Sequence, residues 1–139
     1  MKDILFEKKI ELRIKFGGRC EAAIDIEVIR GNNGVNDRKN IVIDGELIGK
    51  TNLTMCRSGD DIVWNVRPIV EGTTVKIKSV VFVSGDNVLT IQKISDTQYK
   101  GRSGNLKGVG QYCIKIEICG CNGSETPVED EINPYISCN

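Results

Sequence analysis

Apolar and polar residues alternate along most of this chain with a period of two. From Ile10 to Phe16 every second residue is apolar, and the residues between them are Glu11, Arg13 and Lys15. This period places the apolar side chains on one face of an extended strand. The Gly17-Gly18 pair then ends the run. We therefore predict a half-buried strand over this segment.

The same kind of run recurs along the chain, and clusters of Gly, Asn and Asp separate the runs, as in Gly31-Asn32-Asn33-Gly34. These clusters suit turns because Gly, Asn and Asp tolerate turn backbone conformations. No segment has a helical period, so seven or eight short strands predict a single β-sandwich, with a jelly roll or small β-barrel as alternatives. The further predicted strands are residues 22–28, 41–43, 46–55, 62–70, 73–83, 88–94 and 111–118.

The last of these runs reads Gly-x-Tyr-x-Ile-x-Ile-x-Ile over residues 110–118. It resembles the penultimate or final strand of the immunoglobulin-like β-sandwich domains of bacteria and tailed phages. The resemblance implies antiparallel strands, a corner contact from Tyr112 to the backbone, and Trp64 as the core tryptophan. The Cys-Trp-Cys spacing of antibody domains is missing, because Cys20 lies 44 residues before Trp64. The resemblance therefore implies an architecture and no functional residue.

Composition narrows the possible functions. The 139 residues include 19 basic and 19 acidic side chains and no histidine, which excludes Ser-His and Cys-His nucleophile pairs and imidazole metal ligands. A net charge of zero does not provide the basic field that non-specific nucleic-acid binding needs. No apolar run approaches the length of a membrane span. We expect no enzymatic activity, no cofactor, no specific nucleic-acid partner and no membrane insertion.

Cysteine is the one residue type here with an open chemical interpretation. The first ten residues do not read as a signal peptide, so we expect reduced thiols. A four-thiolate zinc site from Cys113, Cys119, Cys121 and Cys138 is an alternative, but paired Cys-x-x-Cys motifs are absent. Small buried thiols or a disulfide near the C-terminus explain the pattern at least as well. We predict no metal site.

Two other patterns have simple structural explanations. The glycine-rich stretch 101–110 precedes a strand and does not open a helix, so it predicts a loop between strands and not a phosphate site. Asp60 with Asp61, and Asp86 with Asp96, could serve acid-base chemistry or calcium binding. Asp beside Gly in a short segment is typical of turns, and we interpret these carboxylates as turn residues.

The C-terminal segment differs from the rest of the chain. After residue 119 there are four acidic and no basic residues, so residues 1–119 carry the balancing positive charge. Two prolines and the lack of alternation predict that residues 122–139 form an acidic arm outside a sandwich domain of residues 1–121.

The apolar end of this arm suits docking in a groove of a neighbouring subunit or of the domain itself. We therefore predict that Pro134, Tyr135 and Ile136 bind a partner. If the arm is not the attachment surface, the basic stretch from Arg67 to Lys107 is the second choice.

These features predict a non-enzymatic structural or assembly protein. The chain looks similar in type to the small auxiliary or decoration proteins of tailed-phage capsids. This implies capsid or other shell subunits as partners, a possible homo-oligomer, and a place in a virion assembled in the host cytoplasm. The alternative functions are a bacterial carbohydrate-binding or surface-adhesion module and a small enzyme using Cys or carboxylate chemistry. The alternative locations are the cytoplasm and the cell surface. An aromatic content of 5% weakens the carbohydrate alternative.

Overall fold

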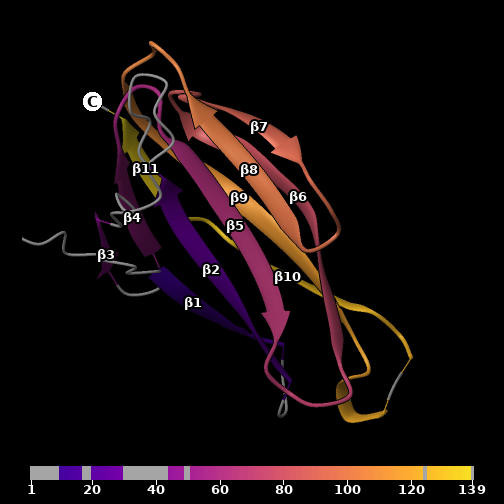
Figure 1. The fold of residues 1–139 in the computed structure, drawn as a ribbon. Helices are drawn as coiled ribbons and strands as arrows, with labels where there is room; N and C mark the ends of the chain where they lie inside the picture. Colours follow the sequence, from indigo (N-terminus) through magenta and orange to yellow (C-terminus); the bar gives the residue numbers. More distant parts are fainter. Residues whose placement is uncertain (1–9, 17–19, 30–43, 49–50, 124, 139) are drawn as a thin grey trace, which may run out of the picture.

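The chain folds into β-strands joined by turns (Figure 1). The computed structural model describes residues 10–16, 20–29, 44–48, 51–123 and 125–138. Within these ranges there is no α-helix, which confirms the all-β prediction, and a single 3-10 turn covers Cys121–Gly123. The strands are β1 (Ile10–Lys15), β2 (Glu21–Ile29), β3 (Asp44–Ile48), β4 (Thr51–Cys56), β5 (Asp61–Pro68), β6 (Thr74–Gly85), β7 (Leu89–Lys93), β8 (Gln98–Ser103), β9 (Gly108–Cys119), β10 (Val128–Ile132) and β11 (Tyr135–Cys138).

The strands form two sheets, one behind the other in Figure 1. The first sheet has the order β1-β2-β5-β8-β7, and all of its neighbours are antiparallel. The second has the order β10-β9-β11-β4-β3, with β6 paired to the other edge of β9. The pairing of β11 with β4 is parallel, so the prediction of a purely antiparallel sandwich is wrong at this point.

The core between the sheets is centred on two aromatic residues. Trp64 of β5 and Tyr112 of β9 are both fully buried, and their ring centroids lie 5.4 Å apart. The Trp64 indole N–H donates a hydrogen bond of 3.1 Å to the Tyr112 hydroxyl. The hydroxyl thus contacts a side chain, where the resemblance implied a corner contact to the backbone. The prediction of Trp64 as a core residue is confirmed.

The number of strands exceeds the predicted seven or eight for three reasons. The predicted run 46–55 is divided into β3 and β4, and β8 begins at Gln98 and extends into the stretch predicted as a loop. The C-terminal segment adds β10 and β11. The predicted strand 41–43 lies outside the described residues. The loop prediction for 101–110 therefore holds only for the residues between Ser103 and Gly108.

The segment predicted as an arm outside the sandwich is part of the second sheet. β10 and β11 follow β9 in one antiparallel register, from Val128 opposite Ile118 to Cys138 opposite Gly108. The two strands are separated at Pro134, which has no N–H to donate, although its carbonyl accepts a 3.0 Å hydrogen bond from the Tyr112 amide. The C-terminal segment therefore supplies two strands of the second sheet, with β11 between β9 and β4.

Four of the six cysteines form disulfides, which corrects the expectation of reduced thiols. Cys20 is bonded to Cys121, with Cα atoms 5.5 Å apart, and Cys56 to Cys138, with Cα atoms 4.7 Å apart. The partners lie 101 and 82 residues apart in sequence, a separation that local spacing could not reveal. The four cysteines considered for zinc are thus not gathered in one place. The remaining two, Cys113 and Cys119, are free.

Candidate docking surface

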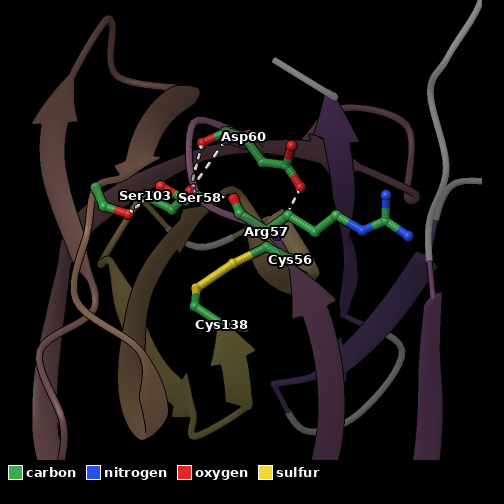
Figure 2. Close-up of a disulfide and its surroundings, with 7 residues drawn as sticks. Cys56, Arg57, Ser58, Asp60, Ser103 and Cys138 are labelled. Carbon is green, nitrogen blue, oxygen red and sulfur yellow. Dashed lines mark hydrogen bonds between the residues drawn. A yellow bond between two sulfur atoms is a disulfide. The ribbon is translucent and has the colours of Figure 1, made fainter. Parts of the chain in front are cut away.

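The end of the second sheet is fixed by the Cys56–Cys138 disulfide (Figure 2). Cys56 is the last residue of β4 and Cys138 the last of β11, and the two are register partners in the parallel pair. Both side chains are buried. Because the bond joins adjacent strand ends, it fixes β11 in its position between β9 and β4.

The turn that follows Cys56 connects this corner to the first sheet. The buried carboxylate of Asp60 accepts a 2.7 Å hydrogen bond from the Arg57 amide, and the Ser103 hydroxyl accepts one of 3.0 Å from the Asp60 amide. The Ser103 amide in turn donates to the Asp60 carbonyl at 2.9 Å. Figure 2 shows Ser103 reaching this turn from β8. The interpretation of Asp60 as a turn residue is confirmed.

The outward face of the first sheet is polar and connected by ion pairs. Arg67 of β5 pairs with Asp25 of β2 at 2.9 Å and also with Glu11 of β1. Further along the sheet, Asp61 pairs with Arg102 at 2.9 Å. Of the large apolar side chains that the structure describes as exposed, none lies in a strand of this sheet. This face is therefore typical of a solvated surface.

The outward face of the second sheet is different near the disulfide corner. Thr54 and Ile136 are buried, so alternation turns their neighbours outward on the adjacent strands β4 and β11. The same reasoning applies to β6 and β9, where Tyr112 and Val80 point into the core. Five large apolar residues on these four neighbouring strands, each 36–53% exposed, form what we call the apolar face: Met55, Val81, Val83, Val109 and Tyr135.

Away from this corner, the outward side of the second sheet carries charge. The carboxylate of Glu117 on β9 forms ion pairs with Lys76 at 3.5 Å and with Lys78 at 3.4 Å. At the border between this charged region and the apolar face, the thiol of Cys113, the register partner of Val81, donates a 3.3 Å hydrogen bond to the carboxylate of Glu131 on β10. Burial, together with this carboxylate, raises the pKa of Cys113 to about 11. The thiol is therefore protonated at neutral pH and is a poor nucleophile.

The three residues predicted to bind a partner lie in different surroundings. Pro134 and Ile136 point into the core, and Ile136 is fully buried, whereas Tyr135 is on the apolar face. The other members of that face were missed by the sequence analysis. One signal for them was present, because Val80 to Val83 is continuously apolar and so has apolar residues for both sides of a strand.

The carboxylates named from sequence do not gather into a site. Asp61 pairs with Arg102 and Lys100, and Asp96 pairs with Lys93 at 3.1 Å. Within the described ranges, no three His, Cys, Asp or Glu residues are placed to hold a metal ion. The basic residues between Arg67 and Lys107 are distributed over strands of both sheets.

Comparison of the chain with protein-family models gives no match, and comparison with curated proteins gives none either. In the part of the chain that the structure describes, no helix is long and apolar enough to cross a membrane.

Proposed function

We propose that this protein is a non-enzymatic assembly domain that attaches to a protein partner through the apolar face of its second sheet. The supporting observation is the difference between the two outward faces: one is polar and ion-paired, and the other groups Met55, Val109 and Tyr135 on adjacent strands. Exposed apolar residues that cluster beside polar ones are typical of interaction sites. We infer a partner surface that is itself apolar at its centre.

The more specific form of the proposal is an auxiliary or decoration subunit on a tailed-phage capsid. Its partners would be capsid or other shell subunits, including further copies of the chain. Two disulfides are compatible with a working life on a virion surface, because such surfaces are exposed to oxidising surroundings. The immunoglobulin-like assignment belongs to the same proposal: its support is Trp64 packed on Tyr112, while the parallel β4–β11 pair departs from the usual pattern.

A cell-surface adhesion module is the second candidate, and the same disulfides support it. Sugar-binding platforms use exposed aromatic rings. Among the described side chains, Trp64, Tyr99 and Tyr112 are buried and Tyr135 is partly exposed. An adhesion role would therefore rely on protein contacts.

The attachment proposal can be tested by sedimentation of the tagged protein expressed in its native source. The wild-type chain should move with a large particle, whereas the variant Met55→Thr/Val109→Thr/Tyr135→Ser should remain in the slow fraction with little change in Tm. The matched control changes the opposite face, as Thr90→Ala/Gln92→Ala, and should sediment like wild type. A wild-type chain found only as a free monomer contradicts the proposal.

A further inference from the structure

The strand β11 is the only described link between the β3–β4 hairpin and the rest of the second sheet. β4 pairs with β3 on one side and with β11 on the other, and β11 pairs with β9. Without β11, the facing edges of β4 and β9 would be left with unpaired backbone groups. We call the space between these two edges the β11 slot.

The slot selects its occupant through side chains as well as backbone. Ile136 points into the core between the sheets and is fully buried, and Pro134 on the same side of the strand is also buried. The parallel register then places Cys138 beside Cys56, where the disulfide forms. An occupant of this slot needs an apolar residue two positions before a cysteine, a condition that the chain's own C-terminal strand meets.

The pairing of β10 and β11 lets the two strands exchange between molecules as one unit. Both strands lie in a single register along β9, from Val128 opposite Ile118 to Cys138 opposite Gly108. Cys121 is held by Cys20, and six residues connect it to β10. Fully extended, six residues span about 20 Å, and Glu125, Thr126 and Pro127 are exposed.

We propose that the β11 slot accepts residues 128–138 of a second copy of this chain, and that the Cys56–Cys138 disulfide then forms between the two chains. Exchange of an identical element preserves all contacts of the closed monomer and is a common route to oligomers. This inference rests on the proposed assembly function and identifies a partner for it: another copy of the same chain. Exchange that is reciprocal gives a dimer, and exchange that continues from chain to chain gives a linear assembly.

The bond between chains forms by ordinary thiol oxidation. The thiols of Cys56 on one chain and Cys138 on the other lose two protons and two electrons and form one S–S bond. A small-molecule disulfide such as oxidised glutathione accepts the electrons and, with two protons, becomes two thiols. The exchange therefore becomes covalent only under oxidising conditions.

The test uses two full-length variants, neither of which can form its own Cys56–Cys138 bond. One carries Cys56→Ala and the other Cys138→Ala, and both carry Cys113→Ser and Cys119→Ser to prevent competing disulfides. The two are mixed, unfolded, and refolded in a glutathione redox buffer. We expect a disulfide-linked heterodimer as the main oxidised species, with the Cys56–Cys138 crosslink identified by peptide mass spectrometry. Circular dichroism and an intact Cys20–Cys121 bond establish that each variant has folded.

Two further changes in the strand-donating Cys56→Ala chain distinguish this proposal from the attachment proposal. Ile136→Asp should reduce the heterodimer yield by about tenfold or more, because a carboxylate would enter the core. Tyr135→Ser should leave the yield unchanged, because that side chain points outward, although it should weaken attachment to a shell. In the wild type, the dimer fraction after refolding should rise with protein concentration. Folded variants whose cysteines remain free or glutathionylated, or a wild type that is monomeric at every concentration, would overturn strand exchange and leave the apolar face untouched.

Discussion

At the residue scale, the fold depends on a few positions where side-chain volume is strictly limited. Gly101 of β8 faces the core, and a Cβ atom placed there would lie 2.9 Å from the Trp64 ring and 3.1 Å from a Leu89 methyl. Glycine is thus required here by packing and not by backbone conformation. The sequence suggested a flexible glycine-rich loop. Glycine occurs both in loops and where a buried ring leaves no space for a side chain, and the sequence alone does not distinguish these two cases.

We predict that Gly101→Ala destabilises the protein by about 1–3 kcal/mol, since Trp64 and Leu89 must move to accommodate the methyl group. Gly104→Ala is the matched control: a Cβ atom added there would meet no atom within 4 Å, so its effect should be within about 0.5 kcal/mol. Urea denaturation of both variants measures the difference. Equal stabilities would show that the indole does not occupy this space.

The ion pairs of the first sheet make a prediction for acid stability. Partial burial opposes ionisation of Asp61, but hydrogen bonding from Arg102 and the charge of Lys100 outweigh it, and the pKa of Asp61 lies below its ordinary value of 3.8. A lowered pKa stabilises the folded state above pH 3.8, and this contribution is lost as the pH falls through the lower value.

Asp61→Asn should therefore reduce the free energy of unfolding by at most about 1 kcal/mol at neutral pH, because the side chain of its partner Arg102 is 68% exposed and solvent screens the pair. The difference from wild type should shrink as the pH falls below the ordinary pKa of a carboxyl. Denaturation curves at several pH values test this. A difference that grows on acidification would contradict the assigned direction.

At the element scale, most internal strands were predictable because one face of each is buried. The C-terminal strand was not, although its inward positions 128, 132, 134, 136 and 138 are apolar. Asp130 interrupts this set on the inward side, and proline is uncommon inside a sheet. An inward charge on an edge strand discourages pairing with other chains. Asp130, which makes the strand hard to recognise in the sequence, thus also disfavours pairing of another chain with the edge of β10.

Neighbouring residues of β11 should differ sharply in their effect on stability. Ile136→Ala removes a fully buried side chain and should cost about 2–5 kcal/mol. Tyr135→Ala changes an outward residue and should cost under about 1 kcal/mol. Thermal unfolding of both variants, with the Cys56–Cys138 bond verified as oxidised, measures this contrast. If Ile136→Ala costs as little stability as Tyr135→Ala, the segment does not pack in the sheet and the arm outside the sandwich is the better description.

At the scale of the whole molecule, two disulfides connect early parts of the chain to its C-terminal segment. In the chain-entropy model, closing loops of this length stabilises the fold by about 4–5 kcal/mol each. The cysteine count allowed such bonds, but their pairing depends on which strands become neighbours. The location of the apolar face depends on the same tertiary pairing, since its members come from four strands that are distant in sequence.

The measurement that most directly tests the attachment role is hydroxyl-radical footprinting of the free chain and of its native assembly, read by mass spectrometry. Met55 and Tyr135 should be labelled in the free chain and strongly protected in the assembly. Ile94, which is 48% exposed and lies just after β7 of the first sheet, should be labelled equally in both. Labelling of Met55 and Tyr135 that is the same in both states would contradict docking through the apolar face.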